Sequence, residues 1–257
     1  MGIVKSLVRP VLEPFFRLTR LDLRAARWRL DALQSCHSEL SAISFLADSP
    51  GAASERLIDL IAPVANRAKQ ARLSGLARRG APDFVHLWPG EHYRLLAALV
   101  EELKPEKVVD IGTFTGLSAL AMLSALPSSA IVITVDVIPW HEILGTFLAE
   151  SDFADGKLSQ LVCDLGRPEN AIKHADLLRD ADLLLVDGPK DGVFERRLLE
   201  NFVRIGLKSR AMLVFDDVRL WNMLEIWRMI TCPKLDFTSL GHWSGTGLVE
   251  WKGPDSS

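Results

Sequence analysis

Five short apolar runs, separated by segments with helical periodicity, constrain the fold of this chain most. The runs are rich in Val, Ile and Leu, and most lack the alternation of apolar and polar residues that a half-exposed strand shows. Such runs are typical of strands covered by helices on both faces, and hence of a largely parallel sheet. We expect strands at residues 108–111, 131–135, 158–163, 183–186 and 212–215.

Two further apolar runs complete the predicted sheet. Residues 237–240 and 247–251 follow a helical segment at 218–230 and have little sequence between them. Because a parallel crossover needs a dozen or more residues, two strands this close pair antiparallel. The sequence therefore predicts an α/β fold with a mostly parallel, seven-stranded sheet that ends in an antiparallel hairpin.

The chain before the first strand is predicted to be helical. Residues 3–47 and 52–76 carry apolar positions at three- and four-residue steps, with a break at Pro50. Pro82 marks a second boundary before a helix at 90–103. We therefore expect an N-terminal helical segment at 1–82 (lid, dimer or packing helices), a domain at 83–253 and a tail at 254–257.

Size and charge limit the classes of function. A chain of 257 residues with 48% apolar residues can bury one sizeable core. A net charge of −3 gives no general attraction to nucleic acid. The first thirty residues are basic, so contact with anionic lipid is one interpretation of this segment. Packing against its own domain or a second subunit is the interpretation that we favour.

Cysteine usage and hydropathy indicate a cytoplasmic protein. Cys36, Cys163 and Cys232 have no paired spacing, which is typical of reduced thiols. No apolar run reaches the roughly eighteen residues that cross a bilayer. The N-terminus also lacks the apolar core and cleavage site of a secretory signal.

A glycine turn follows the first predicted strand. Gly112 and Gly116 let the backbone approach a ligand closely, and the helix that begins at residue 117 offers free N–H groups. A dinucleotide fingerprint would need a glycine where Phe114 stands, and the Phe114 ring would obstruct a pyrophosphate. The turn therefore fits a ligand without a pyrophosphate, and a purely structural turn is the alternative.

The next two strands also end in acids. Asp136 ends the second strand, where a carboxylate can accept hydrogen bonds from both hydroxyl groups of a ribose. A helix cap or an exposed loop acid is the alternative there. Asp164 follows the third strand and either meets an adenine amino group or forms a turn before Gly166.

Three more carboxylates follow the fourth and fifth strands. Asp187 comes directly after one strand, and Asp216 and Asp217 after the other. At one edge of a parallel sheet these acids would repel one another unless a cation lies between them. Hard oxygen ligands suit Mg²⁺. The alternatives are a turn at Asp187 and a helix cap at Asp216 or Asp217.

Residues 91–99 and 108–120, which include the run Asp110-Ile111-Gly112-Thr113-Phe114-Thr115-Gly116, resemble the opening of the S-adenosylmethionine (SAM)-dependent O-methyltransferases of the catechol and caffeoyl-CoA type. The resemblance covers about residues 85–253 and implies a Rossmann-like fold. In that family the glycine loop surrounds the methionine part of SAM, and the acid after the second strand holds the ribose. By this resemblance those roles fall to Asp110, Gly112, Gly116 and Asp136. The full set of predicted cofactor-binding residues also includes Thr113, Phe114, Ser118, Asp164 and Asp187.

The same resemblance implies a metal and a catalytic lysine. Catechol-type enzymes hold their metal with an aspartate after the fourth strand and an Asp-Asn pair after the fifth. Asp187, Asp216 and Asp217 match these positions, but Asp217 replaces the asparagine. An acidic pair here is similar to the metal-dependent sugar methyltransferases of macrolide biosynthesis, so the acceptor class stays open. Lys190 stands three residues after Asp187, as the catalytic lysine does; a surface lysine paired with Asp191 is the alternative.

The resulting hypothesis is a methyltransferase that methylates a hydroxyl group of a small molecule, with Mg²⁺ as a second cofactor and Asp187 and Lys190 as catalytic residues. Because relatives often dimerise, a homodimer is expected. The alternatives are a metal-independent methyltransferase for another acceptor, a nicotinamide-dependent oxidoreductase, which Phe114 argues against, and a non-catalytic module. His86, His92 and His174 form no ligand pattern, and His92 is expected to be structural. Trp140 packs either on adenine or in the core, and Trp221 either lines the acceptor pocket or belongs to the core.

Overall fold

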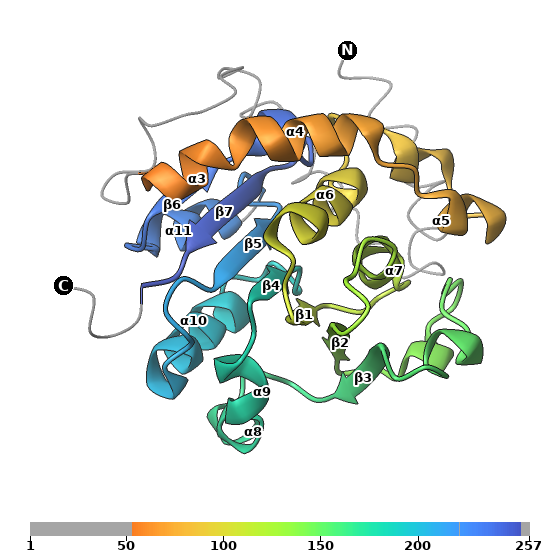
Figure 1. The fold of residues 1–257 in the computed structure, drawn as a ribbon. Helices are drawn as coiled ribbons and strands as arrows, with labels where there is room; N and C mark the ends of the chain where they lie inside the picture. The colour runs from red at the N-terminus through yellow and green to blue at the C-terminus, as the bar shows by residue number, and fades with distance from the viewer. Residues whose placement is uncertain (1–52, 221, 253–257) are drawn as a thin grey trace, which may run out of the picture. The chain divides into compact units, whose positions relative to one another are not determined.

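The computed structural model describes residues 53–220 and 222–252, and within them one sheet has seven strands in the order β3-β2-β1-β4-β5-β7-β6 (Figure 1). The strands are β1 (Lys107–Ile111), β2 (Ile131–Asp136), β3 (Leu158–Val162), β4 (Leu183–Val186), β5 (Met212–Asp216), β6 (Lys234–Asp236) and β7 (Thr246–Glu250). Strands β1 to β5 are parallel, and β7 pairs antiparallel with both β5 and β6. The predicted mostly parallel sheet with an antiparallel C-terminal hairpin is therefore confirmed.

Helices cover both faces of the sheet (Figure 1). One layer holds α3 (Glu55–Asp59), α4 (Ile61–Gln70), α5 (Ser74–Arg78), α6 (Tyr93–Leu103) and α7 (Leu117–Leu123). The other layer holds α8 (Pro168–Lys173), α9 (Ala175–Arg179), α10 (Val193–Ile205) and α11 (Met223–Met229). Short 3₁₀ turns lie at η1 (Asp83–His86), η2 (Trp140–Glu142), η3 (Glu150–Asp152) and η4 (Thr238–Leu240).

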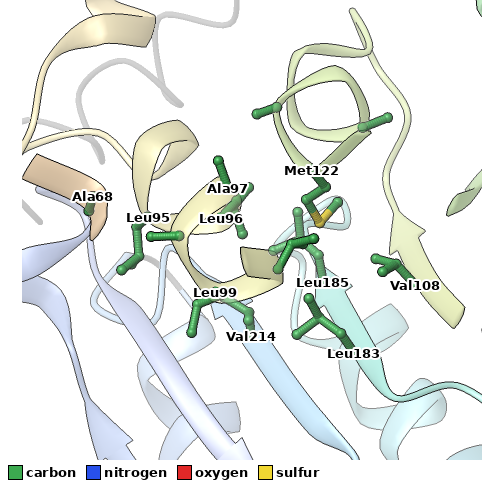
Figure 2. Close-up of a cluster of buried hydrophobic side chains, with 14 of the residues drawn as sticks. Ala68, Leu95, Leu96, Ala97, Leu99, Val108, Met122, Leu183, Leu185 and Val214 are labelled. Carbon is green, nitrogen blue, oxygen red and sulfur yellow. The ribbon is translucent and has the colours of Figure 1, made fainter. Parts of the chain in front are cut away.

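The strands lack polar alternation because both of their faces are buried. Val108 and Leu183 belong to the core under α6 and α7, whereas Val109 and Leu184 belong to the core under α8 to α11. Figure 2 shows Leu95, Leu96 and Leu99 of α6 in the same buried cluster as Leu183 and Leu185 of β4 and Val214 of β5. Full burial of each such side chain contributes about 1.5–3 kcal/mol. These two cores fix the strands whose ends carry the acids.

One predicted strand is wrong. Residues 237–240 do not form a strand; β6 lies just before them, and residues 238–240 form the turn η4. The carboxylate of Asp236 accepts hydrogen bonds from the backbone N (3.0 Å) and the hydroxyl of Thr238. This local bonding competes with the strand ladder and ends β6.

The helix predicted at 52–76 is divided into α3, α4 and α5. Pro63 lacks an N–H group, so the helix restarts with Pro63 in the first turn of α4, where that donor is not needed. The helix predicted at 218–230 is shorter and begins at Met223. The helix predicted at 3–47 lies outside the described residues, and the domain boundary after residue 82 stays a prediction.

Two further observations concern the described residues alone. None of their helices combines the length and the apolar character that crossing a membrane requires. Cys163 and Cys232 are free thiols, whereas Cys36 lies outside the described part of the chain.

Candidate active site

A cavity of about 540 Å³ opens at the carboxyl ends of the parallel strands. It is bounded by the loops that follow β1, β2, β3 and β4 and by the start of α10, which are labelled in Figure 1. Of the residues predicted to form the site, the cavity is lined by Gly112, Phe114, Asp136, Asp164, Asp187 and Lys190. The crevice at this edge is where open α/β sheets bind ligands.

The loop after β1 requires its two glycines. Gly112 has a φ of 114°, and a Cβ atom there would lie 2.0 Å from the backbone oxygen of Asp187. Gly116 has a φ of 82°, and a Cβ atom there would lie 2.3 Å from the Leu148 side chain. Between them Phe114, with a φ of 40°, exposes 70% of its surface beside the cavity. The loop thus lies against the start of the β4 loop and presents an aromatic ring to the cavity.

Asp136 holds this loop from the end of β2. Its Oδ2 accepts a hydrogen bond from the backbone N of Phe114 (3.1 Å), and its Oδ1 accepts one from the backbone N of Ile138 (3.1 Å). A carboxylate has about four acceptor positions, so each oxygen keeps capacity for a ligand hydroxyl group.

Four residues assigned to the cofactor do not line the cavity: Asp110, Thr113, Gly116 and Ser118. Asp110 is fully buried and accepts hydrogen bonds from the hydroxyls of Ser118 (3.1 Å) and Thr134 (2.9 Å). Burial raises the pKa of Asp110 to about 7. These side chains lie beneath the glycine loop and set its shape.

Asp164, Trp140 and Trp221 each had two interpretations from the sequence, a ligand contact or a local structural role. Asp164 lines the cavity, but its carboxylate also accepts hydrogen bonds from the backbone N of Gly166 (2.9 Å) and from Arg167 Nε (3.3 Å), as in the turn interpretation. Trp140 does not line the cavity; it stacks on Phe153 with ring centroids 5.2 Å apart. Trp221 lies outside the described residues.

The three predicted metal ligands do converge. Carboxylate oxygens of Asp187, Asp216 and Asp217 lie within 4.8 Å of one another. The Lys190 ammonium lies among them: it forms an ion pair with Asp187, is 2.8 Å from Asp217 Oδ2 and is 4.0 Å from Asp216 Oδ2. We call these four residues the acidic cluster. Because Asp187 also lines the cavity, cavity and cluster share one wall.

Burial and neighbouring charges compete within the acidic cluster. Burial opposes the charge of Lys190, but the carboxylates of Asp187, Asp217 and Asp216 outweigh burial and raise the pKa of Lys190. Burial, followed by the charge of Asp216, raises the pKa of Asp187. Lys190 therefore keeps its proton in this arrangement, so its action as a base requires these ion pairs to be released.

Two histidines that sequence reasoning did not assign to the site lie against Asp216. Nδ1 of His92, which precedes α6, is 3.2 Å from Asp216 Oδ1, and Nδ1 of His242, from the connection between β6 and β7, is 3.0 Å from the same oxygen. Burial raises the pKa of Asp216, but the charges of both histidines outweigh burial and lower that pKa well below its usual value. Burial likewise opposes protonation of His92, yet the charges of Asp216, Asp187 and Glu91 raise its pKa to about 9.

The outer side of this group contains two more polar residues. Ser244 is fully buried and donates a hydrogen bond to Asp217 Oδ1. Glu91 Oε2 lies 3.6 Å from His242 Nε2. No spacing in the sequence signals these partners, because the fold alone brings Glu91 and Ser244 to the end of β5.

A family model described as O-methyltransferase matches residues 87–225. The chain is 49% identical over 47 residues, 18% of each chain, to catechol O-methyltransferase domain-containing protein 1 of Mus musculus. It is 27% identical over 137 residues to caffeoyl-CoA O-methyltransferase of Stellaria longipes, covering 50% of this chain and 52% of that protein. The chain thus spans about half or less of the length of these relatives.

Solved structures with a similar fold include an O-methyltransferase of Streptomyces achromogenes, involved in tomaymycin synthesis, in complex with SAM. That protein is 20% identical, with 74% of this chain and 90% of that chain covered and a TM-score of 0.44. A methyltransferase of Geobacter sulfurreducens is 19% identical, with coverages of 73% and 88% and a TM-score of 0.46.

Proposed function

This chain belongs to the O-methyltransferase family, and we propose that it transfers the methyl group of SAM to a hydroxyl group of a small molecule. One observation carries the proposal: Asp187 lies both in the wall of the cavity and in the acidic cluster. A donor in the cavity and an acceptor at the cluster would therefore meet at Asp187. Alignment of two reactants in this way can contribute on the order of 7–11 kcal/mol in ideal cases.

The cavity fits the cofactor. Its volume of about 540 Å³ falls within the range of about 300–1,000 Å³ that is usual for small-molecule sites. Asp136 keeps acceptor capacity on both oxygens for the ribose hydroxyls, and Phe114 offers an apolar surface at the edge. When bound, SAM supplies a methyl group activated by the adjacent sulfonium.

The acidic cluster fits a divalent cation. The Lys190 ammonium stands in for a metal cation. It lies among Asp187, Asp216 and Asp217, whose carboxylates stabilise positive charge at that point. The oxygen ligands that these carboxylates offer suit Mg²⁺. When bound, the cation supplies a Lewis acid that lowers the pKa of the acceptor hydroxyl. We propose these three aspartates as its ligands.

Lys190 is the residue that we propose accepts the proton of the acceptor. Its ion pairs with Asp187 and Asp217 hold the proton on Nζ. The carboxylates of Asp187 and Asp217 raise the pKa of Lys190. The lysine can therefore act as a base only when these carboxylates no longer form ion pairs with it. The role of Asp187 is then to position both the donor and the acceptor.

A metal-independent methyltransferase is the second candidate. The ion pair between Lys190 and Asp217, at 2.8 Å, favours it, because the lysine already supplies a cation to the acidic cluster. In this candidate Lys190 would stay protonated and hold the acceptor through a hydrogen bond. The two candidates differ in whether a chelator stops turnover.

Calorimetric titration of SAM into the full chain, with and without Mg²⁺, followed by methylation of a panel of hydroxylated acceptors, tests the proposal. We expect SAM binding in both conditions and Mg²⁺-dependent methylation that EDTA abolishes. Turnover that survives EDTA would favour the metal-independent candidate, and absence of SAM binding would contradict both. Asp155→Asn, which removes the charge of an exposed acid that accepts a hydrogen bond from the Lys157 backbone N, should bind SAM and turn over as the unaltered chain does.

A further inference from the structure

The two oxygens of Asp216 share His242 as a neighbour and otherwise differ in their surroundings. Oδ2 lies 4.0 Å from the Lys190 ammonium and 3.3 Å from His242 Nδ1, whereas Oδ1 lies 3.2 Å from His92 Nδ1 and 3.0 Å from His242 Nδ1. The two imidazole rings lie 5.1 Å apart and nearly at right angles. The ligand-type atoms of His92, Asp216 and His242 all lie within 4.8 Å of one another. We call these three residues the histidine group.

His92 is buried without satisfying its ring nitrogens. The residue is 4% exposed, and neither Nδ1 nor Nε2 has a hydrogen-bond partner among the described residues. Nδ1 is at hydrogen-bonding distance from Asp216 Oδ1, but its direction does not make a hydrogen bond. An unpaired polar group in a protein interior is destabilising and rare, so a buried imidazole in this state indicates a missing partner.

Two distances in the histidine group, from Asp216 Oδ1 to each imidazole, match the spacing of ligands around one cation. Metal–ligand bonds of about 2.1 Å place neighbouring ligand atoms about 3.0–3.4 Å apart at square or tetrahedral angles. The two nitrogen–oxygen distances here are 3.0 and 3.2 Å. Two imidazoles and one carboxylate with an open position also form the donor set of several zinc and iron sites.

We propose that His92, Asp216 and His242 bind a first-row divalent cation of the Zn²⁺ and Co²⁺ class, next to the acidic cluster. Imidazole nitrogen favours such ions, whereas Mg²⁺ prefers oxygen alone. A ring ligates only as neutral imidazole, so the ion would take the place of the proton on each Nδ1 and release it to solvent. The site shares Asp216 with the proposed Mg²⁺ site, and Oδ1 is the oxygen of that carboxylate nearest to both rings. It does not rest on the proposed methyl transfer, because its ligands and its test are independent of SAM.

The bound ion would join three segments that are distant in sequence. His92 precedes α6, Asp216 ends β5, and His242 lies between β6 and β7. Glu91, 3.6 Å from His242 Nε2, supplies negative charge on the outer side. A carboxylate beside the far nitrogen of a ring raises the basicity of that ring, as outer carboxylates do in many histidine metal sites. The ion would thereby fix the orientation of Asp216 toward the acidic cluster.

Titration of the chelator-dialysed full chain with Co²⁺, followed by visible absorption, and with Zn²⁺ by calorimetry, tests the site. We expect tight binding of one equivalent of either ion, and at least a tenfold loss of affinity in His92→Gln and in His242→Gln. His141→Gln is the matched control, because His141 is an exposed histidine in η2, and it should bind Co²⁺ as the unaltered chain does. Asp187→Asn, which leaves all three proposed ligands in place, should keep the Co²⁺ spectrum.

A second measurement needs no variant and so does not depend on whether the variants fold. Proton NMR of the Co²⁺-loaded unaltered chain should show strongly shifted, exchangeable imidazole N–H signals from two histidines. Absence of these signals, or Co²⁺ affinity unchanged in both histidine variants, would overturn the proposal. Because neither readout uses SAM or an acceptor, a failure of the proposed methyl transfer would leave both results unaffected.

Discussion

The cavity beside β1 and β2 differs from the acidic cluster at the ends of β4 and β5 in how each holds its acids. On the cavity side Asp136 accepts hydrogen bonds from backbone N–H groups, and Asp110 beneath the loop is brought toward its neutral form by burial. On the cluster side Asp216 and Asp217 are buried, and Asp216 is held charged by its cationic neighbours.

Backbone hydrogen bonds keep a loop in one conformation, so the cavity side is suited to recognising a ligand of one shape, such as a nucleoside. Paired charges can be exchanged, so the cluster side is suited to admitting a cation or releasing a proton. Substitutions that affect one side alone therefore test whether the two sides are separable.

The largest effect is expected for Asp216→Asn, which keeps the shape of the side chain and removes its charge. It should lower kcat by about a thousandfold or more, equal to about 4 kcal/mol, because both proposed cation sites would exchange a charged carboxylate ligand for a neutral amide. Breaking a buried ion pair typically costs about 3–5 kcal/mol of stability, so the melting temperature should also fall. The affinity for SAM, measured by calorimetry on folded protein, should change less than about threefold.

Asp155→Asn serves again as the control for Asp216→Asn, since both remove one charge but only one acts at the cluster. A parallel loss of SAM affinity and of kcat in Asp216→Asn would show that the cavity and the acidic cluster act as a single unit.

The next largest effect is expected for Asp110→Asn, which tests whether burial keeps the carboxyl group of Asp110 neutral. Burial raises the pKa of Asp110 from 3.8 to about 7 in the folded chain. The protonated form is thus favoured by folding, and its stabilisation is complete below pH 3.8 and is lost as pH rises through about 7. Asparagine does not titrate. Relative to the unaltered chain, the variant should therefore gain stability between pH 4 and pH 8, by up to about 4 kcal/mol.

Denaturant unfolding at several pH values measures this gain. Ser118→Ala, which removes one hydrogen bond to Asp110, is the matched control and should leave the pH dependence largely in place. If the stability difference between Asp110→Asn and the unaltered chain does not vary with pH, Asp110 is already ionised in the folded protein.

The sequence could predict the sheet because burial on both faces leaves continuous apolar runs, as in β1 and β4. Once these strands are parallel, the acids at their ends must share one edge, which is why Asp187, Asp216 and Asp217 were found together. The strand predicted at 237–240 was wrong because of hydrogen bonds between neighbouring residues. The hydrogen bonds from Thr238 to Asp236 end β6 early, and apolar periodicity carries no sign of them.

The sequence could not reveal which side chains of the glycine segment point into the cavity. Asp110 and Ser118 belong to the family motif, yet they hydrogen-bond each other beneath the loop. His92 and His242 were missed for a different reason. They are 150 positions apart, and they meet at Asp216 only because β7 pairs with β5 and so places the β6–β7 connection at the end of β5.

A smaller effect is expected for Asp136→Ala, which tests the cavity side alone. Hydrogen bonds to a charged group contribute about 1.5–3 kcal/mol. Loss of the carboxylate should therefore raise the Kd for SAM by about 10–100-fold and leave Co²⁺ binding at the histidine group unchanged. Asp164→Ala is the control, because its carboxylate forms a local turn. An equal loss of SAM affinity there would support the adenine contact that the sequence left open.

The smallest effect is expected for Phe114→Ala. Because 70% of Phe114 is exposed, its removal should change the stability by no more than about 0.5 kcal/mol. A ring that covers a bound ligand adds up to about 1 kcal/mol of apolar contact, so the Kd for SAM should rise only a few-fold. Leu144→Ala is the control, since Leu144 is 98% exposed and does not line the cavity. A Kd unchanged in Phe114→Ala would mean that the cavity side recognises its ligand through Asp136 and the loop backbone alone.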